Sequence, residues 1–597
     1  MSDYRAPLEE ITFALKTVGG LNEWASMSGY EEAGEDLVSA VLEEAGKLAS
    51  GVIAPTNKIG DEQHPKLVDG AVITPDAFKP MHAAFVEGGW STLSAKPEHG
   101  GQGLPATLSL AVNEMLTSAN MAYSLQSLLT TGAIEAISAH GDAALKEKYL
   151  PNMVSAVWSG AMNLTEPNAG SDVGALRSKA EKQDDGTYLV SGQKIFITWG
   201  DHDLSDNIIH LVLARLPSAP EGTKGISMFL VPKFHVNDDG SLGEANDVRC
   251  VSLEHKLGIH GSPTCVMSFG DEGKCVGYLV GEENRGMAGM FTMMNHARIG
   301  VGVQGVAIAE RAYQQSVSYA LDRVQSAAIG ASTREPVTIV HHPDVRRMLM
   351  TMRATTEAAR AITFRNVWAI DRAHKAMDPD EKRRAQGEAD LLTPISKAYS
   401  TDIGVEVASL GVQIHGGMGF IEETGAAQHY RDSRIAPIYE GTNGIQALDL
   451  VGRKFGADGG VHWRALFEEI SQAAENQRGE LESVRGVMVE GISALRTAAD
   501  TMSKNGFEGF IDTAGAASPY LRLFGTVLGA HLLAQQATHA EQLFKSGDGN
   551  PDFLRAKIAT AKFFIEQILP QATALLGPIQ AGSKCLMALE NNQFARN

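Results

Sequence analysis

Cysteine is scarce in this chain, with only four residues among 597. They are Cys250, Cys265, Cys275 and Cys585, and no two of them have the spacing of a metal site. A long chain with so few thiols is typical of a reducing compartment. We therefore expect a cytoplasmic protein without a metal site.

Long apolar runs are missing as well. No stretch reaches the roughly 20 apolar residues that a membrane-spanning helix needs. The first ten residues (MSDYRAPLEE) lack the basic region and apolar core of a signal peptide, and they are too acidic for a transit peptide. We expect no membrane span and a bacterial, cytoplasmic location.

An excess of basic residues is the third absence. The chain has 51 Lys and Arg against 71 Asp and Glu, a formal net charge of −20. A nucleic-acid partner would need a basic footprint, so this balance argues against one. It does not exclude a small anionic ligand, because local patches of charge decide that.

The length and composition indicate several folded domains. A chain of 597 residues is too long for one hydrophobic core, and we expect three or four domains. A hydrophobic content of 44% with 20% charged residues is typical of a globular protein.

The spacing of apolar residues divides the chain into four parts. Residues 1–160 and 286–455 carry apolar residues at helical spacing. Residues 161–285 instead hold short β-type runs separated by Asp-Gly turns. Residues 456–597 continue as a further helical block after a glycine-rich linker. Strands between helical blocks predict a small β-barrel inserted between two helical domains.

The individual elements follow from the same patterns. The expected strands are residues 188–190, 195–197, 208–213, 226–231 and 265–269. The expected long helices of the third part are residues 287–327, 344–376 and 385–410, with a polar insertion at 330–336.

One stretch places a carboxylate where it can do chemistry. Residues 439–443 (YEGTN) set Glu440 beside a glycine at the start of an apolar helical run. Gly441 lets the backbone approach a ligand closely, and the first N–H groups of a helix can point at an oxygen of that ligand. A carboxylate beside such donors suits proton abstraction next to a polarised carbonyl. Taken alone, the stretch equally fits a capping turn with a solvated glutamate.

A literal match to the dinucleotide fingerprint occurs at residues 300–305 (GVGVQG). That fingerprint needs a preceding strand and a βαβ unit, whereas the residues before this match have a helical pattern. We interpret its glycines as small residues that let two helices approach closely. His415 lies in another glycine-rich loop, and because a lone histidine is usually structural we give it no catalytic role.

Five motifs in order carry a family resemblance. They are residues 163–173 (NLTEPNAGSDV), 192–198 (GQKIFIT), 256–262 (KLGIHGS), 413–420 (QIHGGMGF) and 439–443 (YEGTN). In this order they resemble the acyl-CoA dehydrogenase family, over roughly residues 85 to 455, and an ordered set is far more specific than any single match.

The resemblance implies an α+β multidomain fold. It assigns residues 1–160 to an N-terminal helical domain, 161–285 to a middle β-barrel domain and 286–455 to a helical bundle domain with the catalytic base. Residues 456–597 form a C-terminal helical extension, as in the long subfamily.

The implied reaction removes an α-proton and a β-hydride from an acyl-CoA thioester and gives the trans-2-enoyl-CoA. No side chain accepts a hydride, so FAD is the expected cofactor. Glu440 aligns with the family's base. Its backbone N–H, with a flavin hydroxyl, would hold the thioester oxygen as charge develops.

The resemblance also assigns the binding residues. For FAD they are Met162, Leu164, Thr165, Ser171, Phe196, Ile197, Thr198, Arg323, Gln413, Gly416, Gly417 and Thr442. For the acyl-CoA they are Ser171, Asn295, Arg298 and Gly441. Arg323 matches an arginine that reaches the pyrophosphate of the neighbouring subunit's FAD, where a guanidinium suits two phosphates.

The chain departs from the family's pattern at several of these positions. Phe196 stands where many members have Trp, Asn295 where an Asp is common, and His260 where Arg is usual. The Phe-Gly that usually follows Arg323 is missing, and Gly444 replaces a polar residue. The departures concern the FAD contacts and the partner subunit, and they leave the base untouched.

Within the family, the long form looks most like the group that dehydrogenates 3-(methylthio)propanoyl-CoA in dimethylsulfoniopropionate degradation. A general short-, medium- or long-chain acyl-CoA dehydrogenase of β-oxidation is the alternative. The expected acceptor is electron-transferring flavoprotein, and the expected assembly is a homodimer.

Three more distant readings are weaker. An acyl-CoA oxidase would share the fold and differ in flavin access. A flavin-containing DNA-binding relative would need a basic C-terminal surface, but residues 456–597 hold 12 basic against 15 acidic residues. A nitroalkane-type oxidase would carry Asp at the position of Glu440.

Overall fold

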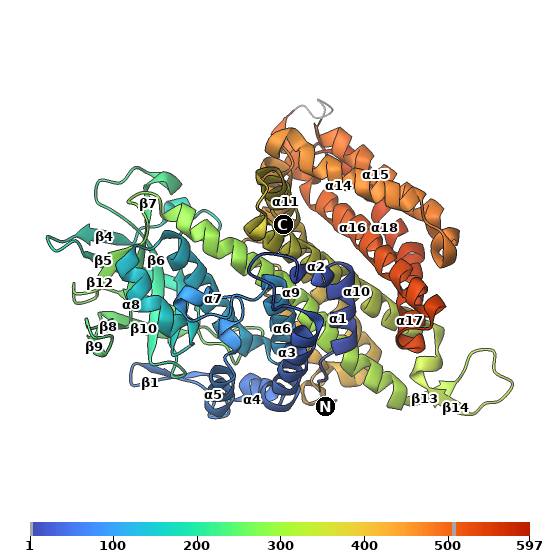
Figure 1. Cartoon of the computed structure of the whole chain (residues 1–597), viewed down its shortest axis with the longest axis horizontal. Helices are drawn as coiled ribbons and strands as arrows, with labels where there is room; N and C mark the ends of the chain where they lie inside the picture. The colour runs from blue at the N-terminus through green and yellow to red at the C-terminus, as the bar shows by residue number, and fades with distance from the viewer. Residues whose placement is uncertain (1–3, 504–508, 597) are drawn as a thin grey trace. The chain divides into compact units, whose positions relative to one another are not determined.

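The computed structural model describes residues 4–503 and 509–596. The chain divides into two compact units (Figure 1). The helical unit comprises Pro7–Ala40 and Val301–Asn597, and the barrel unit comprises Val41–Gly300 with a short N-terminal segment.

The barrel unit contains a closed ring of strands. The ring runs through β4 (Lys179–Lys182), β5 (Tyr188–Thr198), β12 (Val276–Leu279), β7 (Ile226–Pro232) and β6 (Asn207–Arg215). Each strand pairs with the next, and β4 pairs with both β5 and β6, which closes the ring. This confirms the β-barrel expected from the sequence.

Other strands extend this ring. β3 (Trp158–Asn163) pairs in parallel with β6. β11 (Thr264–Phe269) pairs antiparallel with the second half of β5 on one side and with β10 (Val248–Leu253) on the other. Two hairpins complete the strands of this unit, β1 (Lys66–Val68) with β2 (Ala71–Ile73) and β8 (Phe234–Val236) with β9 (Leu242–Ala245).

Strand β6 shows why the sequence folds in this way. Successive side chains of a strand point to opposite faces. Ile209, Leu211 and Leu213 enter a core shared with α7 and α8, whereas Ile208 and Val212 enter the core inside the ring. Because both faces are covered, the strand is apolar along its whole length instead of alternating.

Helices make up the rest of the barrel unit. They are α4 (Ala54–Gln63), α5 (Phe78–Glu87), α6 (Ala106–Ala119), α7 (Met121–His140) and α8 (Ala143–Val154). Helix α3 (Glu35–Leu48) precedes them in the chain.

The helical unit is built on long helices. Its bundle consists of α1 (Leu8–Thr17), α2 (Leu21–Trp24), α9 (Gly286–Asp322) from Val301 on, α10 (Pro343–Lys375), α11 (Pro379–His415), α12 (Ala426–Ser433) and α13 (Asn443–Asp449). The C-terminal extension adds α14 (Val461–Glu475), α15 (Arg485–Ser503), α16 (Phe510–Ser546), α17 (Pro551–Phe563), α18 (Leu569–Thr573) and α19 (Leu576–Ala581). Within this unit α16 packs against α10, α11, α13 and α17.

The GVGVQG stretch lies inside α9, as its helical surroundings indicated. A Cβ atom on Gly305 would lie 2.1 Å from the carbonyl oxygen of Ser400, and one on Gly404 would lie 2.9 Å from the Cα of Gly305. The glycines therefore let α9 and α11 pack closely, and the rejection of a dinucleotide site is confirmed.

Two expected boundaries are wrong. Helix α9 ends at Asp322 instead of continuing to residue 327, because Val324–Ala327 forms β13 and pairs with β14 (Pro336–Thr338). The polar insertion is thus the loop of a β-hairpin. The strands expected at 188–190 and 195–197 are one continuous strand, β5, which passes through Gly192 at φ 140°.

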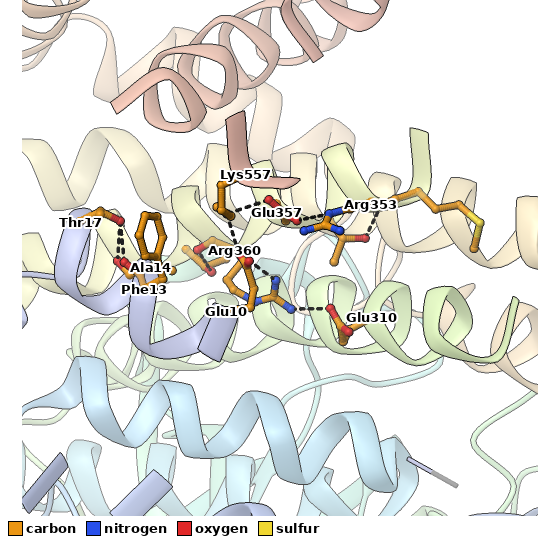
Figure 2. A network of polar contacts seen from close by, with 12 residues as sticks. Glu10, Phe13, Ala14, Thr17, Glu310, Arg353, Glu357, Arg360 and Lys557 are labelled. Atoms are coloured by element: carbon orange, nitrogen blue, oxygen red, sulfur yellow. Dashed lines mark hydrogen bonds and ion pairs between the residues drawn. The ribbon is translucent and has the colours of Figure 1, made fainter. Parts of the chain in front are cut away.

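A buried charge network joins the two ends of the chain to the bundle (Figure 2). Lys557 of α17 lies 2.7 Å from both Glu10 of α1 and Glu357 of α10. Arg353 Nε lies 2.7 Å from Glu357, and Arg360 lies 2.7 Å from a further carboxylate, Glu310 of α9. Three acidic and three basic side chains balance each other, and the Lys557 and Arg360 side chains are completely buried.

Because a buried charge that loses its partner is costly, the network predicts a specific loss of stability. Lys557→Met leaves Glu10 and Glu357 adjacent without their shared cation, and we expect a cost of about 3–5 kcal/mol. The measurement is the urea midpoint of the holoenzyme. Lys545→Met is the control, since Lys545 forms an ion pair in the same extension but its side chain is 68% exposed; we expect a change of less than about 1 kcal/mol there. Equal midpoints for the two variants would show that the network contributes little.

Candidate active site

The backbone at Glu440 is held in an unusual conformation. The loop between α12 and α13 has φ 55° at Glu440 and φ 82° at Gly441, so two successive residues are left-handed. This region is open to glycine but costs other residues roughly 1–2 kcal/mol. Such strain persists only where neighbouring groups impose it, and it is frequent at functional sites.

Buried side chains impose this conformation. Gln446 Nε2 donates to the carbonyl oxygens of Glu440 and Gly441, at 3.3 and 3.2 Å. Lys397 Nζ donates to the same Gly441 oxygen at 2.9 Å. Both donors are fully buried, so the two carbonyls are fixed from the interior of the unit.

The neighbours of Glu440 set its surroundings. Tyr439 donates its hydroxyl hydrogen to Gln304 Oε1 of α9. Burial, and then the charge of Glu440, raise the pKa of Tyr439 well above its usual range, so the phenol stays neutral. Thr442 caps α13 by accepting from the N–H of Ile445 at 3.2 Å. The stretch is thus a capping turn that also presents a half-buried carboxylate.

A second group of expected residues gathers in the barrel unit, where β3 ends. Leu164 and Thr165 follow Met162 there and are half-buried. The N–H of Ile195 donates to the Thr165 carbonyl at 2.9 Å, which joins this end to β5. The structure therefore joins the end of β3 to β5 beside these residues, while their expected contacts with FAD stay predictions.

Phe196 is the most exposed member of this group. Its side chain lies on the surface, with 58% of the residue exposed, and its φ is 60°. A large aromatic residue in left-handed backbone and open to solvent fits a wall for a planar ligand. Ile197 differs, because it is buried in the core of the barrel and only its backbone is left to contact a ligand. Thr198 is half-buried.

A buried ion pair supports this group, and sequence reasoning missed it. Lys194 Nζ lies 2.8 Å from Glu166 and donates to the Leu164 carbonyl at 3.1 Å. Burial lowers the pKa of Lys194 to about 8, and Glu166 offsets part of that shift. Burial alone would raise the pKa of Glu166, but Lys194 and hydrogen bonds from Ser178 and Arg177 hold it below its usual range. Glu166 lies in the motif at 163–173 and Lys194 in the motif at 192–198. Two opposite charges next to predicted strands could therefore have indicated an ion pair from the sequence.

Residues 413–417 lie in the helical unit and are not the loop that the sequence suggested: α11 ends at His415, and a 3-10 helix (Gly416–Phe420) follows it. Gly416 has φ 60°, and a Cβ atom on Gly416 or Gly417 would meet nothing within 4 Å. Gln413 is exposed beside them. His415 instead points inward: it is buried, its Nδ1 lies 2.7 Å from the Gly411 carbonyl, and its ring stacks on that of Tyr319 with 4.4 Å between centroids. The histidine is structural, and the glycines leave open backbone.

The remaining expected residues are more dispersed. Arg323 is exposed where α9 meets the β13–β14 hairpin, with one guanidinium nitrogen 3.4 Å from Gln325. In the barrel unit, Ser171 and Asn295 are exposed, whereas Arg298 is only 4% exposed. The roles expected for these residues stay predictions.

His260, a departure from the family's pattern, has a structural place in the barrel unit. Its Nδ1 lies 2.8 Å from Asp61, and its Nε2 lies 2.8 Å from the Lys256 carbonyl. Its ring lies 4.6 Å from that of His64, centroid to centroid. The side chain is thus committed to contacts inside this unit.

Each unit offers groups that suit part of a flavin dinucleotide. In the barrel unit, the exposed aromatic side chain of Phe196 suits an aromatic ring. In the helical unit, the open glycine backbone at Gly416 and Gly417 and the exposed Arg323 suit phosphates. Residues 4–503 and 509–596 contain no group of three His, Cys, Asp or Glu side chains that could hold a metal ion. None of the helices in the described part of the chain is long and apolar enough to cross a membrane.

Four family models match the chain in succession. The N-terminal domain of acyl-CoA dehydrogenases matches residues 39–156, the middle domain 161–271 and the C-terminal domain 284–455. A fourth, described as acetyl-CoA dehydrogenase C-terminal like, matches residues 466–590.

Individual relatives agree with these matches. A 3-methylmercaptopropionyl-CoA dehydrogenase of Ruegeria pomeroyi is 48% identical over 96% of this chain and 97% of its own. A butyryl-CoA dehydrogenase of Syntrophomonas wolfei is 35% identical over 96% of each chain. The solved structure of an acyl-CoA dehydrogenase complexed with FAD from Bacillus anthracis shares the fold, with a TM-score of 0.74 at 21% identity over 94% of this chain and 90% of that one. The chain belongs to the acyl-CoA dehydrogenase family and is an FAD-dependent oxidoreductase that acts on an acyl-CoA.

Proposed function

We propose that the enzyme converts 3-(methylthio)propanoyl-CoA to 3-(methylthio)acryloyl-CoA, in dimethylsulfoniopropionate degradation, with Glu440 as the base. The observation that supports the base is its conformation: a half-buried carboxylate in left-handed backbone, fixed by buried donors. The support for the substrate is the relative of that activity, 48% identical over nearly the full length of both chains.

In this proposal Glu440 takes the α-proton of the thioester. Its backbone N–H donates to the thioester oxygen, which stabilises the negative charge that develops there. FAD, when bound, supplies the acceptor for the β-hydride. Helix α9 has no Asp or Glu between Gly286 and Ala309 that could act as the base instead of Glu440. The first carboxylate of this helix, Glu310, forms an ion pair with Arg360 in the buried network.

The FAD contacts are proposed for both groups of residues. Thr165 hydrogen-bonds the flavin ring, Met162 and Leu164 line it, and Phe196 with Thr198 covers an edge. In the helical unit, Thr442 contacts the flavin, while residues 413–417 carry the adenine end. Ser171, Asn295, Arg298 and Gly441 serve the acyl-CoA, Ser171 on the phosphate side.

The finer partner and location assignments belong to the same proposal. We propose a homodimer in which Arg323 reaches the pyrophosphate of the partner's FAD, with electron-transferring flavoprotein as the acceptor. The low cysteine content supports a cytoplasmic location.

The base assignment predicts a large, selective loss of rate. Glu440→Gln keeps the shape of the side chain but cannot accept a proton, so we expect turnover to fall about 10²–10⁴-fold. Flavin content and unfolding temperature should stay near the parent values. Glu423→Gln, an exposed carboxylate of the preceding loop, is the control and should keep full activity. Parent-like turnover in Glu440→Gln would refute the assignment of the base.

The substrate proposal predicts which thioesters reduce the flavin. In an anaerobic titration, 3-(methylthio)propanoyl-CoA and butanoyl-CoA should bleach the flavin absorbance at low concentration, because their acyl chains are short and unbranched. Palmitoyl-CoA and isobutyryl-CoA are the comparison thioesters and should leave it yellow. Octanoyl-CoA marks the limit of length. Bleaching by only the long or branched thioesters would contradict the substrate while leaving the reaction class intact.

The dimer proposal predicts two linked results. Light scattering of the holoenzyme should give twice the 63.7 kDa of one chain. Arg323→Ala should lose FAD on gel filtration, because a guanidinium that pairs with two phosphates is absent. Arg334→Ala removes another exposed arginine from the same hairpin and should retain FAD. A monomer, or equal flavin content in the two variants, would count against the cross-subunit contact.

A further inference from the structure

Lys397 of α11 is a fully buried lysine directed at the loop of the base. Its Nζ donates to the Gly441 carbonyl and to Asn443 Oδ1, each at 2.9 Å. Gly441 follows Glu440, and Asn443 begins α13. One ammonium group therefore holds both ends of the turn between the base and the next helix.

Asn443 is bound from its other side as well. Its Nδ2 donates to Asp402 Oδ1 at 2.7 Å, to Thr401 Oγ1 at 3.0 Å and to the Ala398 carbonyl at 3.1 Å. Its backbone N–H donates to the Pro437 carbonyl at 2.9 Å, which closes the loop on itself. The amide thus fastens the start of α13 to one turn of α11.

The C-terminal extension reaches the same turn of α11. Arg522 of α16 lies 2.8 Å from Glu406, and its guanidinium lies 5.3 Å from the centroid of the Tyr399 ring. Burial raises the pKa of Asp402, and the Asn443 amide and the charges of Arg522 and Lys397 act against that rise. The extension thus contacts this part of α11 through Glu406 and the ring of Tyr399.

Close packing puts Arg522 in place. A Cβ atom on Gly525 would lie 2.5 Å from the Tyr399 ring, so α16 approaches α11 as closely as a glycine allows. Helix α16 also packs against α13, the helix that follows the base. The extension therefore contacts both α11 and α13, the helices that hold Lys397 and Gln446.

We propose that Lys397 is a positioning residue for the base, and that Arg522 of the C-terminal extension supports it by holding this part of α11 through Tyr399 and Glu406. The inference rests on the proposed role of Glu440. Without the Lys397 ammonium, the Gly441 carbonyl loses a donor and the left-handed pair loses a main restraint. The carboxylate then moves away from its productive orientation, while substrate binding, which also uses Ser171, Asn295 and Arg298 outside the loop, changes less.

The test is the rate constant of flavin reduction in Lys397→Met. In anaerobic stopped flow with butanoyl-CoA and 3-(methylthio)propanoyl-CoA, we expect this rate constant at saturation to fall about 100-fold, as a 1 Å misplacement costs in other enzymes. The concentration for half-saturation should change less than about threefold, since Ser171, Asn295 and Arg298, which are proposed to bind the acyl-CoA, lie outside the loop. Flavin content is measured in the same sample.

Lys557→Met is the matched control. It makes the same substitution at another fully buried lysine of the helical unit, but in the network between α1, α10 and α17. It should be less stable and yet reduce its flavin at the parent rate below its unfolding temperature. A similar loss of rate in Lys557→Met would overturn a specific role for Lys397.

Two further variants keep the proposal open to refutation. Should Lys397→Met not fold, Gln446→Leu removes the other donor to the same two carbonyls and should show the same split between rate and half-saturation. Arg522→Met, in a side chain that is 30% exposed, should fold and lose about 3–10-fold in rate, less than Lys397→Met because it acts at one remove. An unchanged rate in Gln446→Leu or Lys397→Met refutes the positioning role, and an unchanged rate in Arg522→Met refutes the part of the extension.

Glu440→Gln, measured alongside, separates the two levels of the argument. If it is inactive and Lys397→Met has the parent rate, only the positioning role fails. If Glu440→Gln keeps the parent rate, the assignment of the base fails first.

Discussion

A buried ammonium that donates to a backbone carbonyl is the interaction on which the candidate site depends. Lys397 donates to the Gly441 oxygen in the helical unit, and Lys194 donates to the Leu164 oxygen in the barrel unit. In each unit a non-glycine residue in left-handed backbone stands close by in the chain, Glu440 in one and Phe196 in the other. A charged donor makes a stronger hydrogen bond than a neutral one, particularly in a dry interior. At Glu440 the left-handed backbone is therefore held from the inside by a charged donor to the next carbonyl.

The two lysines differ in how their charge is balanced. Lys194 forms an ion pair with Glu166, whose oxygens also accept from Ser178 and Arg177. Lys397 donates to an amide oxygen, and the nearby carboxylate, Asp402, reaches it through Asn443. Because the Asn443 amide lies between Lys397 and Asp402, the conformation of the loop depends on how that one side chain is oriented. The C-terminal extension contacts the same stretch of α11, where Arg522 lies against Glu406 and Tyr399.

The sequence predicts the fold class and the family well, because both rest on local signals, while Glu440 as the base stays a prediction. Strands β5, β6, β7 and β11 appear in the sequence as apolar runs between turns, whereas β4, with the sequence KAEK, and β12 were not among the expected strands. The supports of the site escaped notice for a physical reason. Lys397 and Gln446 acquire meaning only when α11, α13 and the loop are packed together, and polar residues within helices otherwise indicate a solvated face. The β13–β14 hairpin escaped for another reason: its short strands are exposed and lack the apolar alternation of a buried strand.

The C-terminal extension is part of the helical unit's interior rather than an addition to its surface. Lys557 completes the charge of Glu10 and Glu357, and Gly525 meets Tyr399 at a distance that excludes any other side chain. Removal of the extension would leave two buried carboxylates without their shared cation and would expose the face of α10 and α11 that α16 covers. The bundle residues that face the extension are therefore adapted to it, and a bundle without such an extension must satisfy these positions with other side chains. Helix α16 of the extension contacts both α11 and α13, which flank the loop of Glu440. The extension is therefore part of the packing that surrounds Glu440.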